Sequence, residues 1–165
     1  MKQHGAWMLN FGGRQVAALG LREVLHIAHE PKLTAIPQTP PHCSRVLVAE
    51  ERILPAWDVA VWLGTAVPGR VSPLAAIVAY QESRRAPVQL GALLIAAPPV
   101  RIMVSDDDAC ALPATPSRWR AIAMSCVSYG ERPVPILDLR LMFSDALSAG
   151  RSNPTPAAEP LAEVC

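Results

Sequence analysis

Three short polar segments of this 165-residue chain contain residue types that could bind a metal or a phosphate. Residues 26–30 read His-Ile-Ala-His-Glu, residues 106–108 are three aspartates, and residues 12–13 are two glycines. A zinc-protease helix needs histidines four residues apart with the glutamate between them, and this spacing differs. The aspartates lack the glycine-spaced loop of a calcium site, and no Lys-Ser/Thr pair follows the glycines. We therefore expect surface or half-buried histidines, helix-capping aspartates and a hairpin turn.

Two aspartates occupy the same place in a repeated pattern. Residues 52–63 and 132–143 both read Arg-x-x-Pro-x-x-Asp followed by apolar residues, and the two copies share one offset. A pattern repeated in this way predicts two structurally similar halves. Asp58 and Asp138 each follow a short buried strand and precede a helical turn, the place of an N-cap. Catalysis is the alternative, but no acid or base partner lies at an informative spacing.

Composition excludes several functional classes. The net charge is +1, which gives no basic surface for nucleic acid and no polybasic membrane signal. The longest apolar run, residues 90–100, contains two prolines and is far shorter than the ~20 residues that span a bilayer. No signal-peptide pattern opens the chain. We expect a soluble intracellular protein that is not an enzyme and has no cofactor or metal.

The four cysteines show no metal-ligand spacing. They are expected to be small buried residues in a reducing cytosol, with Cys165 as an exposed thiol on a tail. The cysteines are Cys43, Cys110, Cys126 and Cys165.

The elements that must position these residues are short strands. Seventeen prolines disfavour long helices and favour many strands with stiff connections. The sequence predicts one lobe over residues 6–66 and a second over 72–147, separated by a Gly/Pro/Ser loop, with a disordered tail at 148–165. Each lobe is expected to hold about five antiparallel strands. The fold class is therefore all-β, with two small barrels packed together and short helical turns.

Three stretches resemble the CheW-like domain, the adaptor of bacterial chemotaxis. They are the opening hairpin with Leu-Arg-Glu-Val-Leu at 21–25, the segment 40–63, and the closing strand 134–143. Together they frame residues 6–147, and the domain is assigned to residues 1–147. The resemblance implies two five-stranded SH3-like barrels. It also implies a cytoplasmic, non-enzymatic adaptor that is recruited to membrane receptor arrays and binds a CheA-type histidine kinase and the cytoplasmic tip of chemoreceptors.

The resemblance also assigns candidate interaction residues. Val24 keeps an apolar receptor-contact position, with ordinary core packing as the alternative, while Arg45 replaces a family glycine. Glu50 and Glu51 stand where the family has Arg-Gly, and Glu50 reverses the charge. A reversed charge in an interface changes the choice of partner more than the fold. For Glu50 and Glu51 the alternative is a solvated turn. A groove lined by apolar residues between the lobes is a further candidate, for the kinase.

Two functions are therefore open. One is the receptor–kinase adaptor. The other is a divergent module that keeps the fold and binds a different signalling, pilus-motility or polar-localisation partner. A third class, a small-molecule-binding or hydrolytic barrel, would need a polar cluster inside an open barrel, and the sequence offers none.

Overall fold

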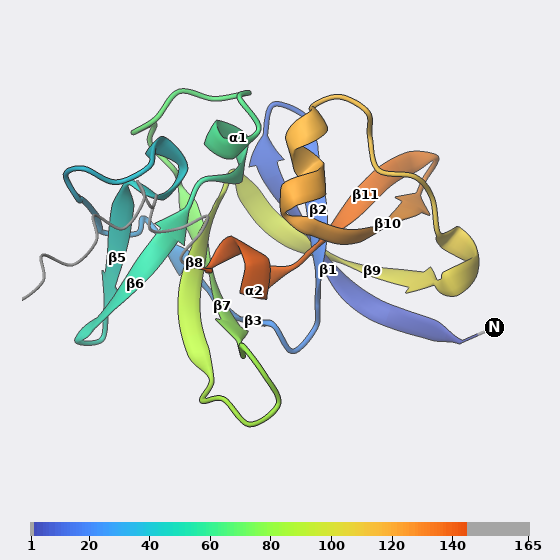
Figure 1. Cartoon of the computed structure of the whole chain (residues 1–165), viewed down its shortest axis with the longest axis horizontal. Coiled ribbons are helices and arrows are strands. Elements are labelled where there is room, and N and C mark those ends of the chain that lie inside the picture. The colour runs from blue at the N-terminus through green and yellow to red at the C-terminus, as the bar shows by residue number, and fades with distance from the viewer. Residues whose placement is uncertain (1, 145–165) are drawn as a thin grey trace, which may run out of the picture.

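The computed structural model describes residues 2–144, which form two β-sheets joined side by side (Figure 1). The first sheet has the order β10-β11-β2-β1-β9 and the second β3-β7-β8-β6-β5-β4. The strands of the first sheet are β10 (Ala123–Tyr129), β11 (Arg132–Leu137), β2 (Gln15–Gly20), β1 (Gln3–Gly12) and β9 (Ala97–Ser105). Those of the second are β3 (Val24–His29), β7 (Leu74–Tyr80), β8 (Gln89–Ile95), β6 (Arg52–Trp57), β5 (Arg45–Ala49) and β4 (Leu33–Ala35).

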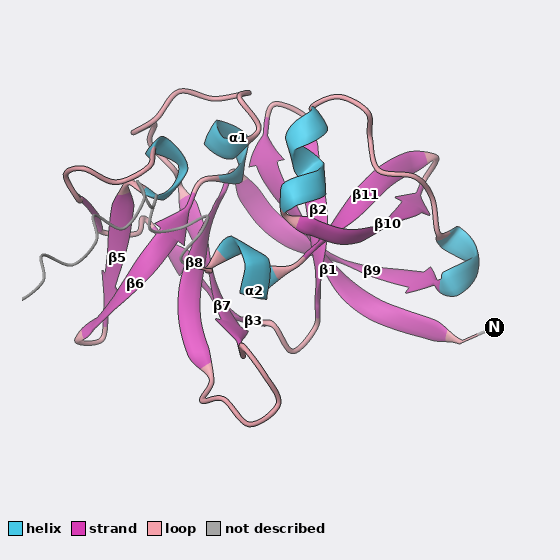
Figure 2. Cartoon of the chain, in the orientation of Figure 1, coloured by secondary structure: helices cyan, strands magenta, loops and turns pink. Residues whose placement is uncertain are grey.

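The helical elements are all short pieces at strand ends (Figure 2). They are η1 (Pro41–Cys43), α1 (Val59–Trp62), η2 (Asp106–Asp108), η3 (Ser117–Ala121) and α2 (Leu139–Met142). This arrangement confirms the predicted all-β fold class, two small strand units with short helical turns, although the second sheet has six strands where about five were expected. No helix among residues 2–144 is long and apolar enough to cross a bilayer. The predicted tail, 148–165, lies outside the described residues.

The predicted division into lobes 6–66 and 72–147 does not match the sheets. Strands β1 and β2 pair with β9, β10 and β11 from the second half of the chain, while β3 to β6 pair with β7 and β8. Each half thus gives its first hairpin to one sheet and its remaining strands to the other. Sequence contiguity suggested separate lobes, but the first hairpin of each half belongs to the sheet that is built mainly from the other half. Each sheet also contains one parallel pair, β2 with β11 and β6 with β8, where only antiparallel pairs were expected.

The repeated pattern does produce matching local structure. Asp58 caps α1 at φ −104° and ψ 97°, and Asp138 caps α2 at φ −103° and ψ 97°. Both carboxylates accept backbone N–H bonds from the first turn, as an N-cap side chain does. Both predicted caps are therefore confirmed.

Two connections and one capped turn complete the architecture. Residues 31–41 contain the three-residue strand β4, which pairs with β5. Residues 81–88 connect β7 to β8, which begins at Gln89. The expected capping by the aspartates is seen in a capping box between Ser105 and Asp108 at η2.

The central strands are buried on both faces, which explains their continuous apolar runs. Alternate residues of β7 and β8 enter different cores. Leu93 and Ile95 join the central core between the sheets, whereas Ala92 and Leu94 join the core of the second sheet. A third, smaller core lies within the first sheet around Ile102 and Val134. The central core holds residues from both sheets and from both short α-helices, so it joins the two units.

A side-chain contact also ties the two halves of the chain together across α1 and η3. The indole Nε1 of Trp62 donates to the Arg118 carbonyl at 3.1 Å, and Nη1 of Arg118 donates to the Trp62 carbonyl at 3.0 Å. The guanidinium lies 4.0 Å from the centre of the Trp62 ring, a cation–π contact. These two residues are 56 positions apart in the chain.

Candidate protein-docking site

A groove of about 340 Å³ lies where the two sheets meet beside α2. It is formed by the turn before β3, the end of β7 and the segment after it, strand β10, and the start of α2. Its lining mixes charged and apolar side chains, where a purely apolar groove was expected. The lining residues are Arg22, Glu23, Ala79, Tyr80, Gln81, Val88, Met124, Asp138, Leu139 and Arg140.

Glu23 is held in the groove by the turn that follows β2. Its Oε2 accepts a hydrogen bond from the Gly20 N–H at 2.7 Å, and its carbonyl accepts from the Ala79 N–H at 2.8 Å. Burial raises the pKa of the Glu23 carboxyl; the Gly20 bond opposes this, and the charge of Asp138 adds to it. The charge of Asp138 therefore acts on Glu23 across the groove.

Asp138 is placed in the groove by its role as the N-cap of α2. Its Oδ1 accepts from the N–H groups of Arg140 at 3.1 Å and Leu141 at 3.3 Å. The Arg140 Nε lies 3.7 Å away, but that side chain is 60% exposed. An ion pair this open to water is weak, so Asp138 has no strong cationic partner among the described residues.

The equivalent carboxylate in the other sheet is neutralised. Arg70 Nε and Nη2 donate to the two oxygens of Asp58 at 3.1 and 3.0 Å, a bidentate contact. The same Nη2 donates to the Phe11 carbonyl at 2.8 Å. A second guanidinium, from Arg45, lies 3.7 Å from Asp58. The two repeats thus differ in one respect. Asp58 forms an ion pair with arginine, whereas Asp138 lines the groove.

The aromatic wall of the groove is fixed by close packing behind it. The rings of Tyr80 and Phe143 stack with centroids 5.0 Å apart and planes 10° from parallel. Gly91 in β8 lies directly against the Phe143 ring, where an added Cβ would come within 2.4 Å of a ring carbon. The absence of a side chain at Gly91 therefore allows Phe143 to hold Tyr80 in place.

Two of the sequence-predicted interaction residues have structural contacts. Val24 opens β3, pairs with Val78 and packs against the central core. Arg45 donates from Nη1 to the Arg70 carbonyl at 2.8 Å, besides its contact with Asp58. Both side chains are partly buried.

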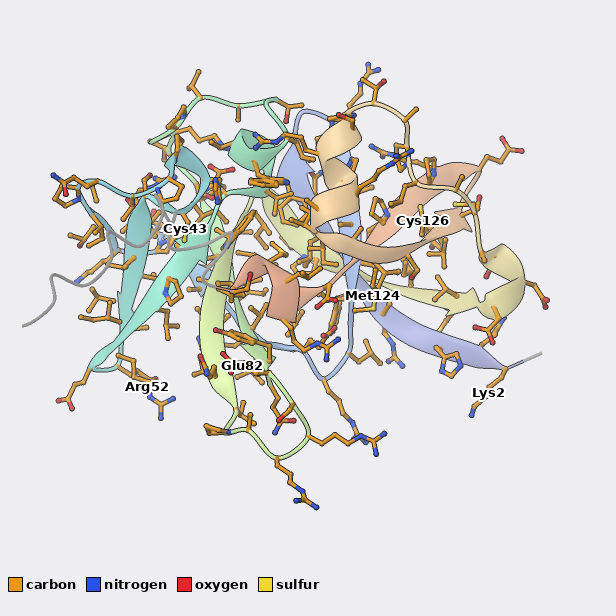
Figure 3. The ribbon with its side chains drawn as sticks, viewed as in Figure 1. Lys2, Cys43, Arg52, Glu82, Met124 and Cys126 are labelled. Atoms are coloured by element: carbon orange, nitrogen blue, oxygen red, sulfur yellow. The ribbon has the colours of Figure 1, made fainter. Side chains whose placement is uncertain are left out.

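Glu50 and Glu51 form the tip of the β5–β6 hairpin and are exposed. Their φ angles are 45° and 65°, the pair of positive values that a two-residue type I′ turn requires. Figure 3 shows Arg52 at this tip, well away from Cys43 at the opposite end of the hairpin. Below the tip, Val48 and Ile53 face each other across the strands and are both exposed.

The four predicted residues are therefore not one cluster. Arg45 and Glu50 flank β5 from opposite ends, and Val24 lies on β3, at the other side of the second sheet. A groove between the lobes was expected from the sequence, but its lining residues were not assigned. Of its residues, Asp138 was marked by the repeat, whereas Glu23, Tyr80 and Met124 come from distant segments and carry no shared pattern.

The described residues offer no evident metal chemistry: none of their His, Cys, Asp and Glu side chains form a group of three placed to hold a metal ion. What the arrangement provides is an amphipathic groove and an acidic hairpin tip with apolar neighbours. Both are features of surfaces that bind proteins.

Comparison with known proteins agrees with this geometry. The CheW-like domain family matches residues 7–147. The crystal structure of the scaffolding protein TtCheW from Thermoanaerobacter tengcongensis is similar, with a TM-score of 0.69 and 15% sequence identity over 87% of this chain and 90% of that one. A search of curated proteins found no match. The family match spans nearly all of the described residues, and the chain belongs to the CheW-like domain family.

Proposed function

We propose that this chain is an adaptor that couples chemoreceptors to a CheA-type histidine kinase in chemotaxis-type signalling. CheW-like domains are non-catalytic scaffolding domains, and the chain is one of them. The observation that carries the proposal is the groove between the sheets, which offers apolar side chains flanked by Glu23 and Asp138. In this role the protein is cytoplasmic and is recruited to receptor arrays at the membrane.

The groove suits an amphipathic helix of a partner. Helix-in-groove recognition inserts apolar anchors of the bound helix into a groove, and Tyr80, Val88 and Met124 offer apolar surface for such anchors. Met124 is 57% exposed, and Figure 3 shows it near α2, between the sheets. An exposed methionine adapts its shape to an incoming side chain at low cost.

The hairpin tip is a second surface. Val48 and Ile53 form an exposed apolar pair, and Glu50 and Glu51 place two negative charges at its end. Glutamate at positive φ is less favourable than glycine or asparagine there, by about 1 kcal/mol. Positive φ also occurs at other turn residues, such as Glu131, so the support for a binding role comes from the exposure and charge of the tip. An adaptor needs two separate surfaces, and the groove and the tip supply them.

A second function is favoured by one observation at this tip. The resemblance places Glu50 and Glu51 where the family has Arg-Gly, so the charge offered to a partner is reversed. A partner that approached the family surface with a carboxylate would be repelled here. A divergent module with a different signalling, pilus-motility or polar-localisation partner would have this property.

The test is direct binding to the CheA-type kinase and to a receptor cytoplasmic fragment from the same genome, measured by calorimetry. The adaptor proposal expects both to bind and Met124→Asp to weaken one of them at least tenfold, because a charge enters an apolar contact. Met103→Asp is the matched control, since Met103 is 46% exposed on β9 and does not line the groove. Absence of binding to both proteins would favour the divergent module.

Glu50→Arg tests the hairpin tip separately. We expect it to change the affinity for one partner at least severalfold while the melting temperature stays the same, because the side chain is exposed at the hairpin tip. Binding is followed by calorimetry and folding by circular dichroism. A large fall in melting temperature would show that Glu50 is structural and would overturn the interface claim.

A further inference from the structure

We propose that Cys110 and Cys126 form a thiol-oxidation site, which a small-molecule disulfide of the glutathione class converts into an intramolecular disulfide. The Sγ atoms of these two residues are 3.4 Å apart. They are 16 positions apart in sequence, and both are free thiols in this structure.

The backbone around the pair has the geometry that a disulfide needs. Ala109 and Val127 form an isolated antiparallel bridge, and Cys110 and Cys126 are the next pair of residues along the two segments. The Cys110 N–H donates to the Cys126 carbonyl at 3.0 Å. Directly opposed residues of an antiparallel pair have Cα atoms about 4.5–5.5 Å apart, within the roughly 4.4–6.8 Å range of disulfides. Side-chain rotation alone can bring the sulfurs into bonding distance.

The two thiols differ in accessibility, which sets the order of the reaction. Cys110 is partly exposed, whereas Cys126 is buried. Burial, together with the contact to Cys110, raises the pKa of the Cys126 thiol to about 12. Only thiolates attack disulfides, so the accessible Cys110 reacts first and Cys126 second.

The exchange takes two steps. The Cys110 thiolate attacks one sulfur of the small disulfide, forming a mixed disulfide and releasing one thiolate. Cys126 then loses its proton to solvent and attacks the Cys110 sulfur, which releases the second thiolate. The two protein thiols are oxidised by two electrons, and the small disulfide is reduced to two thiols.

The bond would fix the segment after η2 against β10, an edge strand of the first sheet. Strand β10 also carries Met124 of the inter-sheet groove. Closing a loop of this length restricts the unfolded chain and stabilises the native state. The site does not depend on the identity of the adaptor's partners.

The experiment treats the full chain, in a Cys165→Ser background, with oxidised glutathione and maps non-reduced peptides by mass spectrometry. We expect a peptide pair linked through Cys110 and Cys126, and a melting temperature that rises by several degrees and falls again on reduction. Cys43 serves as the internal control because it is buried and lies on the other side of the molecule from Cys126 (Figure 3).

Matched variants make each outcome decisive. Cys110→Ser should leave Cys126 unmodified while the protein stays folded, and Cys126→Ser should stop the reaction at glutathione attached to Cys110. A wild-type pair that stops at the mixed disulfide, or that reacts only after thermal unfolding, would overturn the proposal. Links to Cys43 as the major product would overturn it as well.

Discussion

At the scale of single residues, the two capping aspartates show how one sequence pattern serves two purposes. Asp58 and Asp138 have the same backbone geometry and the same capping role. Only Asp58 receives a bidentate arginine, because Arg70 follows in the loop after α1. The chain after α2 supplies no such residue within the described region. One repeat therefore uses its carboxylate for stability, and the other leaves it available at the groove.

This difference predicts unequal costs for the same substitution. Asp58→Asn keeps a capping side chain but leaves Arg70 without its counter-charge, so we expect a loss of about 2–3 kcal/mol in the free energy of unfolding. Asp138→Asn should cost less than about 1 kcal/mol, because its ion pair is exposed. Urea denaturation measures both. Equal losses would contradict the assignment of a structural ion pair to Asp58 alone.

Glu23 makes stability depend on pH in a defined direction. Burial first, and then Asp138, raise its pKa above the ordinary value of 4.5. A carboxyl with a raised pKa in the folded state favours folding when protonated. Its contribution is therefore complete below pH 4.5 and is lost as the pH rises through the raised value. Glu23→Gln removes this dependence and can still accept the Gly20 bond.

We therefore expect Glu23→Gln to gain stability relative to wild type as the pH rises from about 4 to about 8. Chemical denaturation at the two pH values gives the difference. Glu82→Gln is the control, because it removes a carboxylate that is exposed beside the same face. If the wild type instead became more stable relative to Glu23→Gln as the pH rises, the raised pKa of Glu23 would be contradicted.

At the scale of elements, sequence periodicity located the strands but not their partners. Alternating or continuous apolar runs marked most strands, and the repeat marked both α-helices with their caps. The missed features depend on other segments. Strand β4 is too short to show a pattern and exists because β5 offers a free edge. Gly91 looked like an ordinary strand residue, yet it accommodates the Phe143 ring from the end of the second repeat.

The contact between β8 and Phe143 can be tested by filling the space at Gly91. Gly91→Ala would force the Phe143 ring to move, and we expect a loss of about 1–3 kcal/mol together with weaker binding at the groove, because Tyr80 stacks on that ring. Phe143→Leu should be less damaging in the Gly91→Ala background than alone. Additive losses in this double-mutant cycle would contradict direct contact.

At the scale of the whole molecule, two similar units were predictable and their construction was not. The repeat indicated two halves, but a pattern of local residues carries no information on which hairpin pairs with which sheet. A groove between the units was expected, but its residues could not be assigned for the same reason, since they come from the turn before β3, from β7, from β10 and from α2. A site formed by four separate segments leaves no single sequence motif that could be recognised.

The pairing of strands from both halves within each sheet predicts that neither half folds alone. A fragment of residues 1–68 holds β1 and β2 without β9, β10 and β11, and holds β3 to β6 without β7 and β8. Both sheets and the central core would be incomplete, and the Trp62–Arg118 contact would be lost. We expect fragments 1–68 and 69–147 to give unfolded spectra separately and to regain β-structure when they are mixed. The intact chain should unfold in one transition. Circular dichroism and proton–nitrogen NMR spectra measure this. A dispersed NMR spectrum from either isolated fragment would show that one half of the chain can fold alone. The shared central core would then not be required for folding.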